Sequence, residues 1–211
     1  MVHDMRGRIL AHRGLWSQKS DQNSLDALAA AITEGFGFET DLRDFSGEIV
    51  VSHDIPNHSA PQLSDLLKSI DSHSPSSSQM LAWNIKADGL LNKLVAAQLP
   101  GDSFYFDMSF PQELLFLKAN LPIAKRLSEF EKQNARAEHR HFWLDAFEDD
   151  WYLEELELIL PLIKKSRVTL VSSELHGRDM SKCWDFFKKF ATDEHNLSIC
   201  TDHPRELLGY L

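Results

Sequence analysis

Short apolar runs recur along the chain and alternate with amphipathic segments. Apolar runs of this length, bounded by polar segments, indicate β-strands. The pattern predicts eight of them, spread over the whole sequence. We expect strands at Arg8–Ala11, Phe38–Leu42, Leu81–Ile85, Phe104–Met108, Ile123–Leu127, Phe142–Ala146, Val168–Val171 and Leu197–Cys200.

Segments between these runs show helical periodicity. Ser24–Thr33 places Leu25, Leu28 and Ile32 on one helical face, and Tyr152–Lys165 repeats this spacing with five apolar residues. Regular alternation of strands and helices implies parallel strands joined by crossover helices.

Eight strand–helix units fit an α/β fold, the closed (β/α)8 or TIM barrel, although 211 residues make a compact example. An open doubly wound sheet is the chief alternative. The chain has neither the G-x-G-x-x-G motif nor the P-loop that marks the usual ligand crevice of such a sheet. A chain of this length suits one well-buried domain, so we expect a single domain over residues 1–211.

One further strand is expected outside the barrel pattern. Ile49–Ser52 is a ninth strand-like run, and Phe45-Ser46-Gly47 before it is typical of a hairpin turn. The sequence therefore predicts an extra β-hairpin after the second strand. The polar segment Ser72–Ser78 is expected to be a loop rather than a domain boundary, because the strand–helix alternation resumes after it.

The net charge of the chain indicates which classes of ligand it can bind. The formal net charge is −10, whereas surfaces that bind nucleic acid need clustered Lys and Arg. Nucleic acid is therefore not expected as a partner. A small phosphorylated ligand is still compatible with this charge, because Arg13, Lys86 and a bound cation would make one site locally positive.

Cysteine usage and the opening residues bear on location. Cys183 and Cys200 are the only cysteines and have no C-x-x-C spacing, which favours buried thiols in a reducing compartment. The first residues lead into only three apolar ones, too few for the core of a signal peptide, and no later run is long enough for a membrane span. We expect a cytoplasmic protein.

Two carboxylates form the first candidate site. Glu39 and Asp41 lie at positions i and i+2 of one predicted strand, so their side chains share a face. They would repel each other unless a cation or an arginine lay between them. Carboxylate oxygens suit a hard divalent ion, Mg²⁺ or Ca²⁺. The alternative is an exposed pair at a strand edge.

Two histidines follow strand-like runs near these carboxylates. His12 ends the first run and precedes Arg13-Gly14, and the glycine allows close approach of the backbone to a ligand. His53 follows the ninth run and precedes Asp54. Each histidine is a candidate acid or base, and each also has a structural interpretation as a hydrogen-bonded side chain.

These motifs resemble those of the glycerophosphodiester phosphodiesterase family. That family has H-R-G, then a glutamate and an aspartate separated by one residue, then H-D, and the same order occurs here. Three later segments also resemble family motifs, so the resemblance spans nearly the whole chain. They are Met80–Lys86, Phe106–Phe110 and Thr201–Pro204.

The resemblance implies a role for each matching residue. His12 and His53 would be the catalytic acid and base, and Glu39 and Asp41 would hold the cation. Asn84 stands where the family has a glutamate, so the third expected metal ligand here is an amide. Arg13 and Lys86 would contact the phosphate.

Two further acids lie at or just beyond the ends of predicted strands. Asp107 ends the fourth strand, and Glu174 follows the seventh. We expect both to contribute to substrate or phosphate binding in the leaving-group region, with capping of the following helix as the alternative.

The sequence thus predicts an enzyme, a metal-dependent phosphodiesterase that cleaves a glycerophosphodiester-like P–O bond with two histidines. Two alternatives stay open. One is a barrel that binds a phosphorylated ligand without cleaving it, because Asn84 removes one charge from the metal site. The other is a phosphodiesterase acting on a glycan or lipid headgroup, because the segment between His53 and Asn84 is shorter than in the family.

Overall fold

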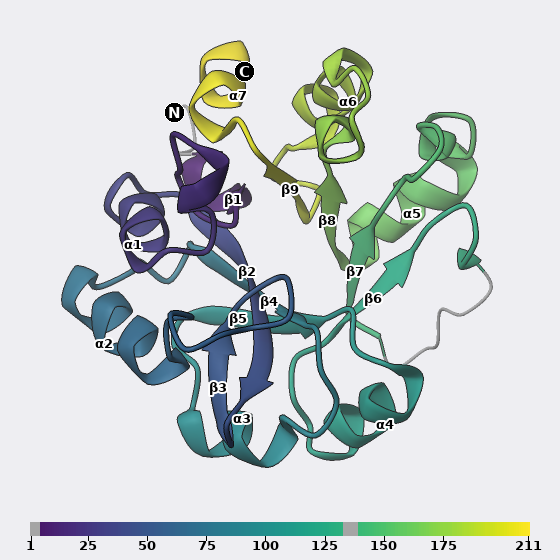
Figure 1. Cartoon of the computed structure of the whole chain (residues 1–211). Helices are drawn as coiled ribbons and strands as arrows, with labels where there is room; N and C mark the ends of the chain where they lie inside the picture. Colours follow the sequence, from purple (N-terminus) through teal and green to yellow (C-terminus); the bar gives the residue numbers. More distant parts are fainter. Residues whose placement is uncertain (1–4, 133–138) are drawn as a thin grey trace. The chain divides into compact units, whose positions relative to one another are not determined.

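The structure is a computed structural model that describes residues 5–132 and 139–211. Its internal contacts divide the chain into two compact units, Met1–Ile123 and Ala124–Leu211. We call them the first and second units and describe each by itself (Figure 1).

The first unit is a parallel sheet with an antiparallel addition. Its parallel strands lie in the order β5-β4-β2-β1, and β3 pairs with β2 in the antiparallel sense. Helices follow the strands, as the alternating pattern predicted. The elements are η1 (Met5–Arg8), β1 (Ile9–His12), η2 (Lys19–Asp21), α1 (Leu25–Thr33), β2 (Gly37–Phe45), β3 (Glu48–Val51), α2 (Leu63–His73), β4 (Met80–Ile85), α3 (Leu91–Ala97), β5 (Asp102–Phe106) and α4 (Phe110–Lys118).

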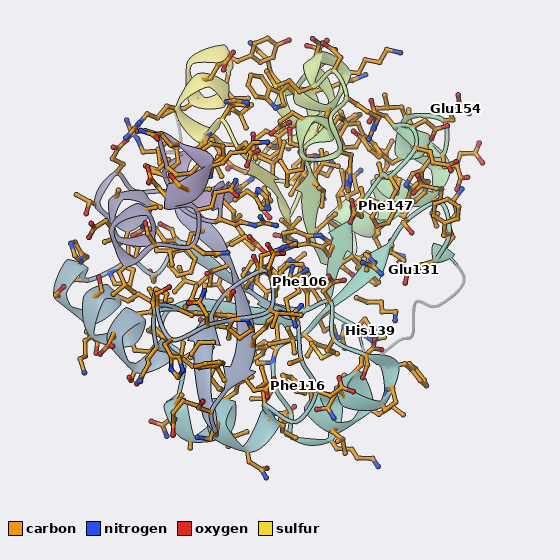
Figure 2. All side chains as sticks on the ribbon, in the orientation of Figure 1. Phe106, Phe116, Glu131, His139, Phe147 and Glu154 are labelled. Carbon is orange, nitrogen blue, oxygen red and sulfur yellow. The ribbon has the colours of Figure 1, made fainter. Side chains whose placement is uncertain are left out.

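Aromatic side chains fill much of the interior of this unit. Trp83 of β4 is fully buried and meets Phe38 of β2 edge to face, with ring centroids 5.5 Å apart. Phe106 of β5 and Phe116 of α4 are also buried (Figure 2). Rings of this size remove large apolar areas from water, which holds the helices against the sheet.

Local signals in the sequence explain two features near the predicted site. Helix α1 begins where expected, because the Ser24 hydroxyl accepts a hydrogen bond from the backbone N–H of Ala27 at 3.2 Å. The extra hairpin is also confirmed. Its turn residues Ser46 and Gly47 have φ values of 50° and 81°, as a two-residue type I′ turn requires.

The second unit is a parallel sheet with strands in the order β9-β8-β7-β6. A hydrogen-bond network lies in its interior. In this network, His141 Nε2 and Ser198 Oγ each lie 2.9 Å from the Thr169 hydroxyl oxygen. The elements are β6 (Ala124–Leu127), β7 (His141–Leu144), η4 (Trp151–Leu153), α5 (Leu156–Lys165), β8 (Arg167–Val171), η5 (Ser173–His176), α6 (Ser181–Phe190), β9 (Leu197–Thr201) and α7 (Pro204–Tyr210).

One helix prediction was wrong at its start. The helix expected over Tyr152–Lys165 is divided into the 3₁₀ turn η4 and the helix α5, because Glu155 has φ −110° and ψ 41° and leaves the helical region. Trp151 fixes the turn by donating from its indole N–H to the Asp145 carbonyl at 2.8 Å. Spacing of apolar residues alone does not reveal such an interruption.

The described residues contain eight parallel strands alternating with helices, and the antiparallel strand β3 follows the second of them. This confirms the predicted (β/α)8 fold with an extra hairpin, with strand bounds shifted by up to three residues. Within the same residues, every helix is too short or too polar to cross a bilayer.

Candidate active site

Two buried carboxylates of β2 form the centre of the candidate site. Glu39 is 2% exposed and Asp41 is fully buried. Strand register places Glu39 beside His12 of β1 and Asp41 beside Asn84 of β4. Alternation along β2 puts both acids on one face, so the predicted pair is not an exposed edge pair.

Glu39 contacts a histidine and an amide. Its Oε2 lies 3.9 Å from His12 Nε2, and its Oε1 accepts a hydrogen bond from Asn84 Nδ2 at 3.2 Å. Burial, followed by the nearby charge of Asp41, raises the pKa of Glu39 from 4.5 to about 7, although nearby cationic groups oppose the shift. Glu39 therefore takes up a proton near neutrality unless positive charge is added beside it.

Asp41 lies between two cationic side chains. Its Oδ2 is 3.2 Å from Arg13 Nε, and its Oδ1 is 3.6 Å from Lys86 Nζ. Lys86 is also 3.3 Å from Asp107 Oδ2, so Asp107 joins this cluster through the lysine. These contacts bring together four of the predicted residues, Arg13, Asp41, Lys86 and Asp107.

Sequence analysis missed Asn23, which holds Asp41 in place. Its Nδ2 donates to Asp41 Oδ2 at 2.9 Å, while its Oδ1 accepts from the Thr40 hydroxyl at 2.7 Å. Its backbone N–H donates to the Arg13 carbonyl at 2.9 Å. The Asn-Ser pair before α1 is a weak signal, since Asn tolerates the left-handed conformation that Asn23 adopts.

Left-handed backbone geometry recurs at this site. Arg13, Asn23 and Asp107 have φ values of 57°, 61° and 67°. Such conformations are uncommon for residues other than glycine and concentrate at functional sites. Gly14 has φ 90°, and a Cβ there would come within 2.6 Å of the Ala27 backbone. The close approach predicted for this glycine is therefore an approach to α1.

His53 lies beyond the end of β3 and is 44% exposed. Its Nδ1 is 2.8 Å from Asp54 Oδ1, and its carbonyl accepts from Arg43 Nε at 3.0 Å. The hydrogen bond from His53 lowers the pKa of the Asp54 carboxyl. His53 and Arg13 line one cavity of about 400 Å³. Within the described residues, no hydrogen bond or ion pair joins His53 to Glu39 or Asp41.

The oxygens of this site suit a hard cation. Glu39 Oε2, Asp41 Oδ1 and Asn84 Oδ1 are buried and accept no hydrogen bond from the described residues. Buried polar oxygens normally accept hydrogen bonds, so three neighbouring oxygens that accept none from those residues, one of them in an ion pair with Lys86 at 3.6 Å, suit added positive charge. The described part of the chain has no metal-binding group of three or more His, Cys, Asp or Glu. The donor set is two carboxylates and one amide, which fits Mg²⁺ or Ca²⁺.

Glu174 belongs to the second unit. Its carboxylate accepts hydrogen bonds from the Ser172 hydroxyl, from the Thr201 hydroxyl at 2.5 Å and from the Asp202 backbone N–H at 3.0 Å. These bonds tie η5 to the end of β9. Its predicted contact with substrate stays a prediction.

No family model matches the sequence, and no curated protein sequence matches it. Solved structures do match. One is a glycerophosphodiester phosphodiesterase from Thermotoga maritima, with a TM-score of 0.63 and 18% identity over 97% of this chain and 98% of that one. Another is a phosphodiesterase from Oleispira antarctica in complex with the product sn-glycerol-3-phosphate, with a TM-score of 0.64 and 15% identity over 96% and 95%. The chain therefore has the fold of these two phosphodiesterases along nearly its whole length.

Proposed function

We propose that this protein is an enzyme, a metal-dependent phosphodiesterase that cleaves a glycerophosphodiester-like P–O bond. The observation that carries this proposal is a set of three buried oxygens, from Glu39, Asp41 and Asn84, that accept no hydrogen bond from the described residues and are flanked by Arg13 and Lys86. Two further findings support it. The chain shares the fold of two phosphodiesterases, and its motifs follow the order of the glycerophosphodiester family.

Glu39, Asp41 and Asn84 would hold a divalent cation, Mg²⁺ or Ca²⁺. When bound, the cation supplies positive charge that polarises a phosphoryl oxygen and lowers the pKa of a nearby hydroxyl. With Asn84 in the third position, the site carries two negative charges rather than the three of the family pattern. A bound phosphodiester adds a further anionic oxygen, so we expect substrate and cation to strengthen each other's binding.

Arg13 and Lys86 would bind the non-bridging oxygens of the phosphate. Each already contacts Asp41, which fixes its position before substrate arrives. A guanidinium has five N–H donors and an ammonium has three, so donors remain after these ion pairs form. Fixed donors aimed at a phosphoryl group stabilise the charge that develops during its transfer.

His12 and His53 would move the protons. An attacking hydroxyl oxygen forms a bond to phosphorus, and its proton passes to one histidine. The bond from phosphorus to the leaving oxygen breaks, and the other histidine donates a proton to that oxygen. If the attacking hydroxyl belongs to the glycerol, the product is a cyclic phosphate. Water then opens this ring, and the two histidines exchange roles.

The proposed substrate is a small phosphodiester. We expect the protein to act on it in the cytoplasm. The test is turnover of glycerophosphodiesters, cyclic phosphodiesters and glycan phosphodiesters, with Mg²⁺ or Ca²⁺ and after treatment with EDTA. We expect metal-dependent release of glycerol phosphate from the first class. Tight binding with no turnover of any class would instead support the barrel that only binds a phosphorylated ligand.

A further inference from the structure

The cavity beside His53 lies next to the proposed phosphate site but is distinct from the cation site. Arg13 and His53 line it, whereas Glu39, Asp41 and Asn84 do not. In the proposed reaction the attacking hydroxyl is the one near the cation. The cavity adjoins the phosphate-binding Arg13, and Arg13 and Asn23 of its lining separate it from Asp41, which each of them contacts. A cavity beside the phosphate that the cation ligands themselves do not line is placed to receive the alcohol that leaves.

The cavity has a positive side chain available for a ligand. Lys19 lines it and forms no ion pair within residues 5–132 and 139–211. Arg13, which also pairs with Asp41 at 3.2 Å, adds a second positive charge to the lining. The single carboxylate of the lining, that of Asp54, is already paired with His53 at 2.8 Å. An anionic group on a ligand would therefore meet Lys19 without a competing internal partner.

The rest of the lining is rich in hydroxyl groups and contains no Phe, Tyr or Trp among the described residues. Ser20 and Ser59 each donate their hydroxyl to a neighbouring acid or amide, at 3.2 Å and 2.7 Å. Their oxygens keep lone pairs that can accept from the hydroxyls of a ligand. Quaternary ammonium groups are instead recognised by aromatic faces, and Lys19 would repel them.

We propose that this cavity binds the leaving alcohol of the substrate and selects a polyol that carries a negative charge over an alcohol with a quaternary ammonium group. This inference rests on the proposed function for its description of the occupant as a leaving group. The volume of about 400 Å³ is sufficient for a phosphorylated sugar-like ring.

Kinetics with three substrates test the selection. We expect kcat/KM to fall from glycerophosphoinositol 4-phosphate to glycerophosphoglycerol to glycerophosphocholine. Lys19→Glu should lower kcat/KM for the first substrate about tenfold, the size of one lost charge-assisted contact, and should not lower it for the third. Lys68→Glu is the matched control, because Lys68 is 75% exposed on α2 and does not line the cavity. An unchanged ratio between first and third substrates in Lys19→Glu would overturn the inference.

Calorimetric titration separates this inference from the proposed function. The probes are myo-inositol 4-phosphate and choline chloride, added to the wild type and to Lys19→Glu. Binding of the inositol phosphate that weakens about tenfold in the variant supports the cavity assignment even if no diester is cleaved. Equal binding to both proteins, preferential binding of choline, or no binding of either probe would overturn it, whether or not the enzyme is active.

Discussion

Two acids of the first unit, Glu39 and Asp41, differ from Glu174 of the second unit in how fully their carboxylate oxygens are hydrogen-bonded. In the first unit, Glu39 Oε2 and Asp41 Oδ1 are buried and accept no hydrogen bond from the described residues. In the second unit, both oxygens of Glu174 accept hydrogen bonds, from the Ser172 and Thr201 hydroxyls and from a backbone N–H. The carboxylates of Glu39 and Asp41 therefore have hydrogen-bonding capacity left for a ligand, whereas the carboxylate of Glu174 has a hydrogen-bond donor at each oxygen.

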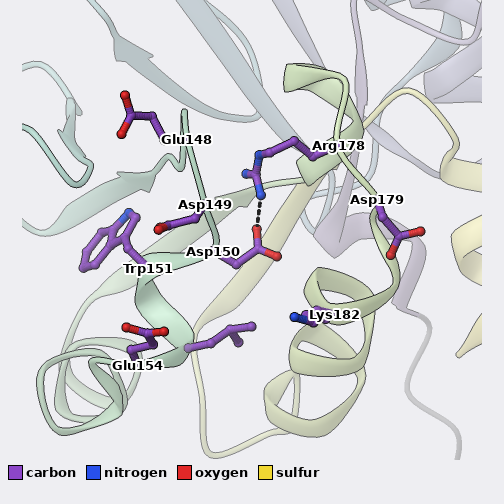
Figure 3. Close-up of a pocket in the computed structure, with 9 residues that line it drawn as sticks. Glu148, Asp149, Asp150, Trp151, Glu154, Arg178, Asp179 and Lys182 are labelled. Carbon is purple, nitrogen blue, oxygen red and sulfur yellow. Dashed lines mark hydrogen bonds and ion pairs between the residues drawn. The ribbon is translucent and has the colours of Figure 1, made fainter.

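Asp150 of the second unit is also hydrogen-bonded, through one of its carboxylate oxygens. Its Oδ1 accepts from Arg178 Nη1 at 2.7 Å (Figure 3). The same oxygen accepts from the Ser173 hydroxyl at 2.8 Å. The sequence suggests only that Asp150 is an acid near the start of a helix. In the structure, Asp150 pairs with the guanidinium of Arg178, which lies in the loop after η5. A cavity of about 410 Å³ adjoins it, but acidic side chains dominate its lining.

This difference separates stabilising acids from functional ones. Leaving a buried polar group without a partner costs about 1–3 kcal/mol, so each such group calls for a physical explanation. Glu129 Oε2 of the second unit is also buried without a hydrogen bond from the described residues, whereas in the first unit three such oxygens come from neighbouring positions of β2 and β4. Glu174 and Asp150 of the second unit hold loops together. Glu39 and Asp41 of the first unit keep oxygens that accept no hydrogen bond from the described part of the chain although Arg13 and Lys86 lie nearby, which suits a further positive charge.

The largest effect should come from the histidines of the first unit. His12→Ala and His53→Ala should each lower phosphodiester turnover about a hundredfold or more, because each removes a general acid or base. His176→Ala is the control, since His176 pairs with Asp145 of the second unit at 2.7 Å. It should change the melting temperature more than turnover. Near-normal turnover in either of the first two variants would remove that histidine from the mechanism.

Cation affinity should respond to the carboxylate count of the site. Asp41→Asn should weaken Mg²⁺ or Ca²⁺ binding about tenfold or more, and Asn84→Glu should strengthen it, because each changes the ligand charge by one unit. Calorimetric titration with and without a non-hydrolysable phosphodiester measures both. If Asn84→Glu has no effect while Asp41→Asn abolishes binding, Asn84 lies outside the coordination shell.

Glu174 should matter more for stability than for turnover. Glu174→Gln keeps the shape of the side chain but replaces an acceptor oxygen by an NH₂ group, which leaves one of its three donors unpaired. We expect a loss of about 1–3 kcal/mol in the free energy of unfolding, measured in urea. A large fall in turnover with unchanged stability would instead establish the substrate contact that the sequence predicts.

Much of the first unit was predictable because its signals are local. Period-two alternation places Glu39 and Asp41 on one face, and the motif order brings His12 and Asn84 to the neighbouring strands. Asn23 was not predictable, because its role depends on contacts with Thr40 and Asp41, far away in the sequence. No local pattern encodes such a partner.

The second unit shows the same limit. The hydrogen bonds of Glu174 to Thr201 and Asp202 join η5 to the end of β9, 27 and 28 residues away in the sequence. From the sequence alone, an acid after a strand looks equally suited to a ligand or to a loop. Only the positions of its donors in space distinguish the two.

The smallest effect concerns pH and contrasts a buried group from each unit. The pKa of Glu39 rises from 4.5 to about 7, so the folded protein binds more protons than the unfolded chain in that window. Its contribution to stability therefore falls as pH rises from 4.5 to 7. Burial, and then the charge of Arg167, lowers the pKa of His141 well below 6.5. Its contribution is present above pH 6.5 and falls as pH drops below that value.

These two slopes oppose each other between pH 4.5 and 6.5, so variants are needed to separate them. Each group contributes at most about 1.4 kcal/mol per pH unit. Relative to the wild type, Glu39→Gln should make stability fall more steeply on acidification, and His141→Gln should make it fall less steeply. Urea unfolding at a series of pH values without divalent cation measures both slopes, and differences between variants cancel the contributions of other groups.

A divalent cation tests the same electrostatics at a single pH. Mg²⁺ or Ca²⁺ at pH 7 should raise the stability of the wild type more than that of Glu39→Gln. The reason is that the cation offsets the negative charge of Glu39, whose burial raises the pKa of this residue. Identical slopes in the wild type and Glu39→Gln would mean that Glu39 ionises normally, and the contrast between the carboxylates of Glu39 and Glu174 would lose its electrostatic basis.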